Sequence, residues 1–234
     1  MRNNSGLGCC YFYNGRKVQK MKNKKYKRNR RKKNKFKPWM IAIIIIIVLI
    51  ILGVWGRGYL EDKLQVQSLG KTKSPEWIDK QIIEKDGVSR NGKKLECVKD
   101  IVIHYVGNPG STAQGNHDFY VSPQSNVSSH FVVGLKGEII QCIPLNEMSA
   151  ASNWRNNDTI SIEVCHPDDS GKFNKKTYQS LVKLTAWLLE RCDLKEKHII
   201  RHYDITGKEC PRYYVRHEDK WKKFKDDVKK YRGK

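Results

Sequence analysis

The segment from Trp39 to Trp55 most limits what this chain can fold into. Its sequence, WMIAIIIIIVLIILGVW, contains no charged residue. A helix spans the hydrocarbon core of a bilayer with about 17 to 20 apolar residues, and tryptophan favours both membrane interfaces. A single domain of this size offers no interior that could enclose a helix apolar on all sides. We therefore predict a transmembrane helix over residues 39–56 rather than a buried core helix.

A cleaved signal peptide is another interpretation of this apolar run. Signal peptides have a positively charged region, an apolar region of about 7 to 15 residues and a cleavage site between small residues. Here the basic region with its fifteen Lys and Arg residues is very long, the apolar run is longer than usual, and no A-x-A-like cleavage site follows it. We prefer the uncleaved span and keep cleavage as the alternative.

The positive charge of the chain is concentrated at its N-terminal end. Residues 1–38 carry fifteen Lys and Arg and no acidic residue, whereas the rest of the chain carries 31 basic and 24 acidic residues. Positively charged segments beside a span stay in the cytoplasm, so we expect a single-pass protein of the cell membrane with its large C-terminal part outside. The tail is expected to stay disordered and to lie against anionic lipid headgroups. No nucleic-acid partner is expected, although a tethered nucleic-acid or lipid-binding protein is a rival interpretation.

Composition and turn signals divide the chain into four regions. They are a basic disordered cytoplasmic tail (1–38), the transmembrane helix (39–56), an extracytoplasmic stalk (57–94) and a globular domain (95–231). Within the stalk, Ser74 as N-cap, Pro75 at the first helical position and Gly87 as a stop predict a short helix.

The globular domain combines β-branched runs with amphipathic segments. Strands are predicted in CVKDIVIHYVG, in TISIEVCH, in HIIRH and in the hairpin SSHFVVGLKGEIIQCIPL, and helices in NKKTYQSLVKLTAWLLERCDL and EDKWKKFKDDVKKY. Strands mixed with long helices predict an α/β domain with a mixed central β-sheet flanked by helices.

Seven cysteines form an odd and irregularly spaced set. Two of them precede the span, and five fall in the predicted domain: Cys97, Cys142, Cys165, Cys192 and Cys210. An exported domain could pair some of them in a disulfide, but an odd number leaves at least one for another role. Cys210 is the candidate for that role.

The stretch IIRHYDITGKECP holds residue types that bind metals and turn chains: His202, Gly207, Lys208, Cys210 and Pro211. Gly207 allows the chain to double back, so that Cys210 can return to the side of His202. A catalytic zinc takes three protein ligands from His, Cys or carboxylate and keeps one position open. His104, at the end of the first predicted strand, could supply the third ligand. From spacing alone, a core thiol and a surface histidine remain an alternative interpretation.

Four motifs in sequence order carry a resemblance to a known family. DIVIHYVGNPG, SSHFVVGLKGEIIQCIP, ISIEVCHPD and IIRHYDITGKECP resemble the zinc-dependent N-acetylmuramoyl-L-alanine amidases of the type 2 family, which includes the peptidoglycan recognition proteins. The similarity covers residues 95–215. It implies that Zn²⁺ is bound by His104, His202 and Cys210, because relatives use the His that closes the first strand, the His of the fourth motif, and a Cys or Asp in the loop that follows.

The resemblance also implies catalytic roles for two residues. Glu163 lies on the strand ISIEV, where relatives place a carboxylate facing the metal site, and Lys208 lies where several relatives carry a basic residue near the substrate carbonyl. Alternation along that strand puts Glu163 on the face opposite Ile160, Ile162 and Val164. A surface acid and a solvated loop lysine are the simpler interpretations without the resemblance.

One position departs from the pattern of some relatives, which carry a tyrosine directly before the His-Phe pair. This chain has Ser129 there, so Glu163 is expected to carry the acid/base role alone. His130 is expected in the wall of the site, because a fourth protein ligand would close the open position of the metal. The predicted substrate-binding residues are Asn116, Ser129, His130, Asn153 and Arg155.

The resemblance implies a membrane-anchored zinc hydrolase that cleaves the amide bond between N-acetylmuramic acid and L-alanine in peptidoglycan, for cell-wall remodelling or lysis. An outward-facing domain would meet that substrate. A recognition module that binds peptidoglycan without cutting it is the closest rival. The presence of Cys210 favours the enzyme, because the family's non-cutting members lack the metal cysteine.

Overall fold

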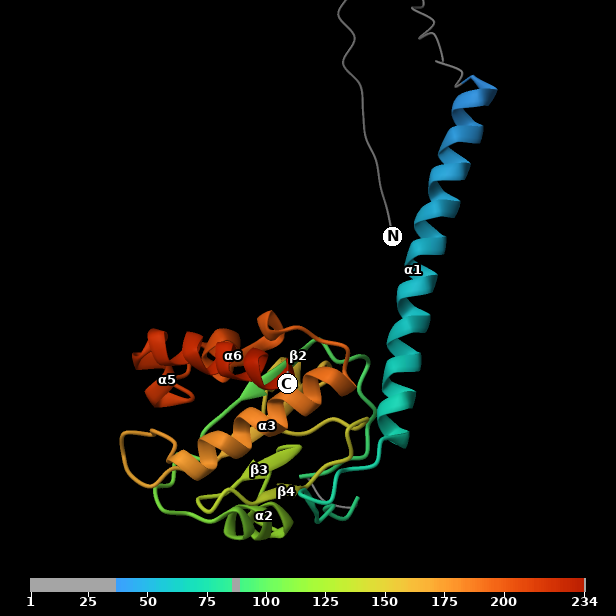
Figure 1. Ribbon diagram of the computed structural model, residues 1–234. Coiled ribbons are helices and arrows are strands. Elements are labelled where there is room, and N and C mark those ends of the chain that lie inside the picture. The colour runs from blue at the N-terminus through green and yellow to red at the C-terminus, as the bar shows by residue number, and fades with distance from the viewer. Residues whose placement is uncertain (1–36, 86–88, 234) are drawn as a thin grey trace, which may run out of the picture. The chain divides into compact units, whose positions relative to one another are not determined.

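The computed structural model describes residues 37–85 and 89–233. The predicted basic tail, apart from its last two residues, lies outside the described residues. By its internal contacts the chain divides into two compact units, Met1–Ile46 and Ile47–Lys234. Of the first unit, the structure describes the start of helix α1 (Pro38–Lys71). The second unit contains the remainder of this helix and the globular domain (Figure 1).

Helix α1 is 34 residues long and contains the apolar run of the sequence. It is long and apolar enough to cross a membrane, and none of its most apolar stretch is buried. A core helix would bury that surface against the domain, so the buried-helix alternative does not describe this segment.

The domain is built on one mixed sheet. Its strands are β1 (Asp79–Lys80), β2 (Asp100–Ile103), β3 (Phe131–Val133), β4 (Ile139–Gln141), β5 (Thr159–Val164) and β6 (Ile199–Arg201). They lie in the order β1-β4-β3-β5-β2-β6, with β3 and β4 antiparallel and every other pair parallel. The predicted hairpin is this β3–β4 pair, and the predicted mixed sheet is confirmed.

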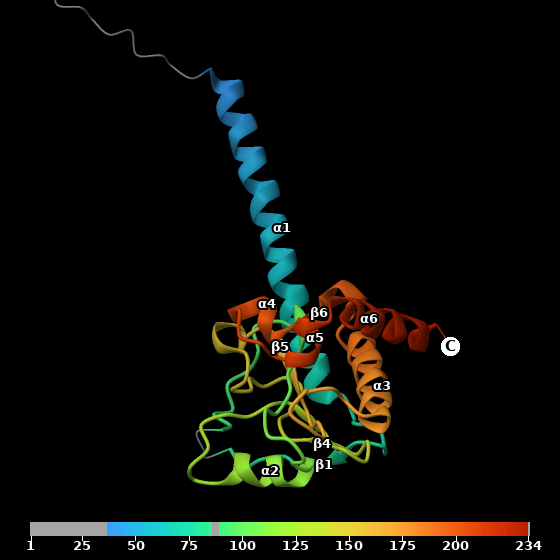
Figure 2. The same ribbon diagram turned by 90° about the vertical axis from the view of Figure 1, so that its left-hand side faces the viewer.

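Helices cover both faces of the sheet. They are α2 (Ala113–Val121), α3 (Lys175–Arg191), α4 (His202–Thr206), α5 (Arg212–Arg216) and α6 (Glu218–Arg232), with 3₁₀ turns η1 (Asn153–Arg155) and η2 (Glu196–His198). Alternate residues of a strand point to opposite faces. Phe131 and Val133 therefore pack in one core cluster with residues of α3 and α6, whereas Val132 packs in the other cluster with Tyr120 of α2. Figure 1 and Figure 2 show these helices around the sheet.

The last two turns of α1 belong to the core of the domain. Val66 and Leu69 are buried among the residues beneath α3 and α6. The side-chain amide of Gln65 donates to the carbonyl oxygen of Cys192 at 2.9 Å and accepts from the backbone N–H of Val98 at 2.8 Å. The first part of the predicted stalk is therefore a helix that is anchored to the domain.

The short helix predicted from Ser74 to Gly87 is wrong for the described part of this segment. Pro75 starts only a single turn, in which its carbonyl accepts from Ile78 at 2.9 Å. Beyond it the chain is extended, because Gln81 donates to the carbonyl of Gln141 at 3.0 Å and strand β1 pairs with the edge of β4. The edge of β4 supplies hydrogen-bond partners for an extended chain, whereas a short helix without tertiary contacts is only marginally stable.

Parallel pairing brings the ends of three strands to one edge. Strand β2 lies between β5 and β6, and Ile103 pairs with Ile162 on one side and Arg201 on the other. The residues that come next, His104, Glu163 and His202, therefore lie side by side at the carboxyl ends of these strands. Ligand sites in α/β sheets form at this edge.

Candidate metal and catalytic site

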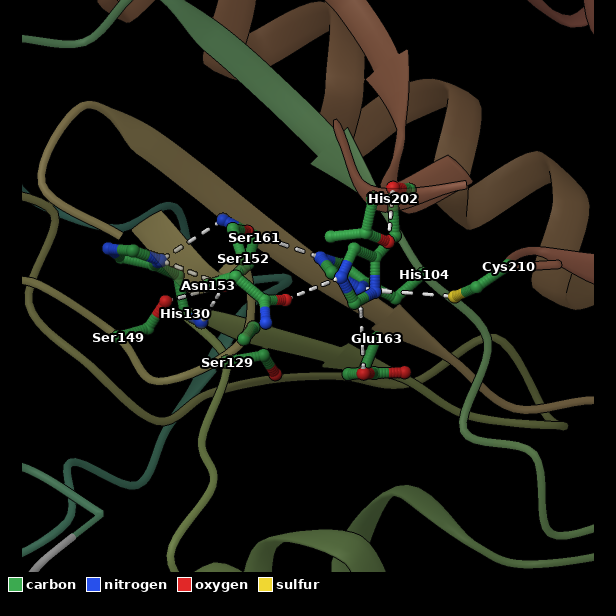
Figure 3. A network of polar contacts seen from close by, with 12 residues as sticks. His104, Ser129, His130, Ser149, Ser152, Asn153, Ser161, Glu163, His202 and Cys210 are labelled. Carbon is green, nitrogen blue, oxygen red and sulfur yellow. Dashed lines mark hydrogen bonds and ion pairs between the residues drawn. The ribbon is translucent and has the colours of Figure 1, made fainter. Parts of the chain in front are cut away.

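Three buried side chains converge at this edge. His104 follows β2, His202 begins α4, and Cys210 lies in the loop between α4 and α5. Each offers one ligand atom, and these atoms all lie within 4.8 Å of one another. The Cys210 Sγ lies 3.9 Å from Nδ1 of His104, and the two imidazole centroids are 4.7 Å apart (Figure 3).

Local backbone geometry returns Cys210 to the histidines. Gly207 ends α4 with φ of 76°, a left-handed conformation that favours glycine. The chain then doubles back, and the N–H of Tyr203 donates to the carbonyl of Cys210 at 2.9 Å. The expectation that Gly207 allows this return is met in the structure.

Glu163 and Lys208 share a cavity with the three predicted ligand residues. The cavity has a volume of about 200 Å³, and its lining also includes Tyr105, Tyr120 and Ser128. Glu163 Oε1 lies 3.9 Å from Nδ1 of His104. Its Oε2 is buried and has no hydrogen-bond partner within the described ranges. Two larger cavities, of about 490 and 600 Å³, lie along α3 and α6 and contain none of these five residues.

Burial sets the protonation of these groups. It lowers the pKa of His104, as do His202 and Lys208 nearby, and it lowers the pKa of His202, with Lys208 as a second cause. Both imidazoles are therefore neutral at pH 7. Burial raises the pKa of Cys210 to about 12, so its thiolate requires a compensating cation. Burial also raises the pKa of Glu163 to about 8, against the opposing charge of Lys208.

This set of residues fits a metal ion. Neutral imidazoles and a thiolate are the ligands that zinc prefers, and three protein ligands leave a fourth position open. Burial raises the pKa of the Cys210 thiol, and Oε2 of Glu163 in the same cavity has no hydrogen-bond partner in the described part of the chain. A bound cation would supply the positive charge that stabilises the ionised forms of both groups.

The five residues predicted for substrate binding lie outside the lining of this cavity. Asn116 donates to the carbonyl of Thr112 at 2.7 Å, and Arg155 forms ion pairs of 2.7 Å with Asp100 and with Asp158. These contacts hold a helix start and a loop in place. The substrate role of both residues stays a prediction.

Ser129 and His130 are fully buried. The Ser129 hydroxyl donates to the carbonyl of Phe131 at 2.8 Å and lies 3.2 Å from the hydroxyl of Tyr120. Nδ1 of His130 accepts from the N–H of Ser161 at 3.1 Å, and Nε2 donates to the carbonyl of Glu147 at 2.8 Å. Burial lowers the pKa of His130 to about 4, so the ring is neutral. Their substrate role also stays a prediction.

Two neighbouring loop residues contact the second nitrogens of the predicted ligand histidines. Asn153 Oδ1 lies 2.9 Å from Nε2 of His202, and Ser152 Oγ lies 3.4 Å from Nε2 of His104. Sequence reasoning proposed Asn153 for substrate binding and did not single out Ser152. Tyr120 was missed as well, because α2 was not predicted.

The five cysteines of the described residues are all buried and carry free thiols. The disulfide that the sequence left open is therefore absent from this part of the chain, while Cys9 and Cys10 lie outside it.

The comparisons with known proteins agree with this geometry. A family model described as N-acetylmuramoyl-L-alanine amidase matches residues 94–213. The amidase CwlL of Bacillus licheniformis is 30% identical in an alignment of 168 positions that covers 64% of this chain and 46% of that protein. The amidase BlyA of Bacillus subtilis (strain 168) is 34% identical in an alignment of 162 positions that covers 60% of this chain and 44% of that protein. The chain thus spans about half the length of the curated relatives it matches.

Solved structures share the fold. A mutant endolysin from Bacillus subtilis superimposes with a TM-score of 0.57 at 28% identity, covering 64% of this chain and 97% of that one. The catalytic domain of XlyA gives a TM-score of 0.57 at 26% identity, covering 64% of this chain and 98% of that domain. The family model matches more than half of the residues, including every predicted metal ligand. This chain belongs to the N-acetylmuramoyl-L-alanine amidase family.

Proposed function

We propose that this protein is a membrane-anchored zinc hydrolase that cleaves the amide bond between N-acetylmuramic acid and L-alanine in peptidoglycan, for cell-wall remodelling or lysis. The observation that carries the proposal is the convergence of His104, His202 and Cys210 with Glu163 and Lys208 in one small cavity. The names of the family and of its relatives support the same bond as the substrate. A module that only recognises peptidoglycan has no need of such a constellation.

The predicted ligands support zinc as the cofactor. His104, His202 and Cys210 would hold it, and the neutral state of both imidazoles is the one that ligation requires. When bound, zinc would polarise the scissile carbonyl and lower the pKa of a water molecule.

Glu163 is the proposed general base. The charge of a bound cation would favour the ionised form of this carboxyl. Its unpartnered Oε2 could then take a proton from the attacking water, and the same carboxyl could pass this proton to the leaving amine of L-alanine. Lys208 lines the same cavity, where its ammonium group would stabilise the negative charge that develops on the carbonyl oxygen. Glu163 is 20% exposed, which leaves it within reach of a substrate entering the cavity.

Helix α1 supports the proposed membrane anchor. Its apolar stretch is long enough to span a bilayer, and the basic residues that precede Trp39 favour a cytoplasmic N-terminus. The domain would then face the cell wall. Protease added to wall-stripped cells should digest the domain; its survival under conditions that remove a known external protein would contradict this orientation.

The function is tested with the full chain in detergent micelles and purified peptidoglycan. Mass spectrometry should find glycan strands with free lactyl carboxylates and stem peptides with a free L-alanine amine. A chelator should abolish these products, and added zinc should restore them. Cys210→Ala should be inactive, whereas Cys97→Ala, which removes a buried thiol outside the site, should cleave normally. Binding without cleavage, or cleavage of a glycosidic bond, would contradict the proposal.

A further inference from the structure

The loop between β4 and β5 touches both ligand histidines at its tip. Asn153 Oδ1 lies 2.9 Å from Nε2 of His202, and Ser152 Oγ lies 3.4 Å from Nε2 of His104 (Figure 3). His104 turns its other nitrogen, Nδ1, toward Cys210 and Glu163, at 3.9 Å from each. Ser152 thus contacts His104 at the ring nitrogen opposite the one that faces Cys210 and Glu163.

The contact with Asn153 selects one tautomer of His202. An amide oxygen has only lone pairs and can only accept a hydrogen bond. Nε2 of His202 must therefore carry the proton, which leaves the lone pair on Nδ1. A flipped Asn153 amide would donate to Nε2 instead and would place the proton on Nδ1, where it would prevent ligation by that atom.

The backbone of the loop holds Asn153 in this place. Asn153 has φ of 54°, a left-handed conformation that is uncommon for residues other than glycine but tolerated by asparagine. The Asn156 side-chain oxygen accepts from the N–H groups of Ala151 at 3.1 Å and Ser152 at 2.6 Å. The N–H of Asn156 donates in turn to the carbonyl of Asn153 at 3.2 Å.

Both ends of the loop are fastened to the sheet. The Ser149 hydroxyl lies 2.7 Å from that of Ser161 on β5. At the other end, the ion pair of Arg155 with Asp100 ties the loop to the start of β2, and its ion pair with Asp158 lies directly before β5. The position of the tip is therefore set by the folded protein itself and does not need a bound substrate.

We propose that Asn153 and Ser152 are positioning residues that hold His202 and His104 with Nδ1 of each ring directed at the metal. The inference rests on the proposed zinc site and deepens it. The Asn153 side-chain oxygen accepts the hydrogen bond from Nε2 of His202. The Ser152 hydroxyl, which can donate or accept, contacts Nε2 of His104 at the longer distance of 3.4 Å and so bears on the orientation of that ring. Partners of this kind fix ring orientation, and their loss typically costs about 10- to 100-fold in metal affinity.

The first test needs no substitution. Long-range ¹H–¹⁵N correlation spectra of the metal-free full chain in detergent micelles report which nitrogen of His202 carries the proton. We expect the Nε2–H form. An Nδ1–H ring in the wild-type protein would overturn the role of Asn153, whatever the zinc affinity proves to be.

The second test compares variants by chelator competition for zinc. Asn153→Gly suits the left-handed backbone and removes only the acceptor, so zinc affinity should fall about 10- to 100-fold. Asn153→Asp keeps a hydrogen-bond acceptor, so its zinc affinity should stay within a few-fold of wild type. Ser152→Ala should reduce zinc affinity less than Asn153→Gly does, because the contact of Ser152 with its histidine is longer. Asp193→Gly is the matched control, since Asp193 is also left-handed, with φ of 52°, but lies at the end of α3.

The outcomes separate this inference from the proposed function. If wild type binds zinc and Asn153→Gly binds it equally well, the positioning role is refuted while the zinc site stands. If wild type itself fails to bind zinc, the proposed function fails and the inference with it. An equal loss of affinity in Asp193→Gly would show a general effect on the fold and would also refute the inference.

Discussion

At the scale of single residues, the groups of the candidate site lie a few ångströms apart and have different proposed roles. His104, His202 and Cys210 would hold the metal, whereas Glu163 would move a proton and Lys208 would stabilise negative charge. Neither of the last two residues is a proposed ligand. Substitutions can therefore separate proton chemistry from metal binding.

Glu163→Gln keeps the shape of the side chain and removes the base. We expect the turnover number to fall at least about a hundredfold with little change in KM, since a general base typically contributes about 10² to 10⁴-fold. Lys208→Ala should lower the turnover number by about tenfold to a hundredfold, which is less than Glu163→Gln, because a bound metal would already supply positive charge near the carbonyl oxygen. Steady-state kinetics on zinc-loaded protein measure both effects. Near-normal turnover of Glu163→Gln with full zinc content would assign the proton transfer to another group.

The buried carboxyl also predicts how stability depends on pH in the metal-free protein. The pKa of Glu163 is about 8 when folded against 4.5 for an exposed glutamate, so the folded state keeps a proton that the unfolded state releases. Stability should therefore be highest below about pH 4.5 for this group and fall as pH rises through about 8. Since the side chain is 20% exposed, we expect a loss of about 1 to 3 kcal/mol rather than the full shift.

Chemical unfolding of wild type and Glu163→Gln between pH 5 and 9, both in chelator, isolates this contribution from those of the other ionisable groups. The difference in unfolding free energy between the two proteins should shift with pH in favour of Glu163→Gln at high pH. A difference independent of pH would show that Glu163 titrates normally.

The convergence of His104, His202 and Cys210 could be predicted because these residues stand in motifs whose order matches a family. The contact of Asn153 with His202 could not, because it depends on a left-handed backbone in a loop without periodic pattern. The same limit applies to Arg155, whose partners Asp100 and Asp158 became visible only once β2 and β5 were paired.

At the scale of elements, strongly patterned segments were predicted and weakly patterned ones were not. The β3–β4 hairpin and helix α3 were found because their apolar residues recur with the strand and helix periods. Helix α2 was missed because it buries only Ala113, His117 and Tyr120. The helix predicted at Ser74 failed because local capping signals cannot show that the edge of β4 is available for pairing.

The end of α1 makes a testable contribution to the domain. Leu69 is 2% exposed in the core, whereas Leu64 on the same helix is 62% exposed. Leu69→Ala should lower the unfolding free energy of the domain by about 2 to 4 kcal/mol because it leaves a cavity, and Leu64→Ala should change it by less than about 0.5 kcal/mol. Denaturant unfolding of the full chain in micelles measures both. Equal stability of the two variants would contradict the packing of α1 against the domain.

In the whole molecule, successive parts of the sequence suit different surroundings. The basic residues before Trp39 suit an anionic membrane surface, the apolar run suits the bilayer, and the domain carries the site. The helix that contains the apolar run ends inside the core of the domain, at Val66 and Leu69. The proposed membrane span would therefore keep the domain close to the bilayer.

Zinc content decides whether the side chains that follow β2, begin α4 and lie in the loop after α4 form the proposed catalytic zinc site. Elemental analysis of the dialysed full chain measures it, with Cys210→Ala and the buried-thiol control Cys97→Ala beside wild type. We expect about one zinc per chain in wild type and in Cys97→Ala, and little zinc in Cys210→Ala. A full zinc complement in Cys210→Ala, or wild-type protein that takes up no zinc when zinc is supplied, would contradict it.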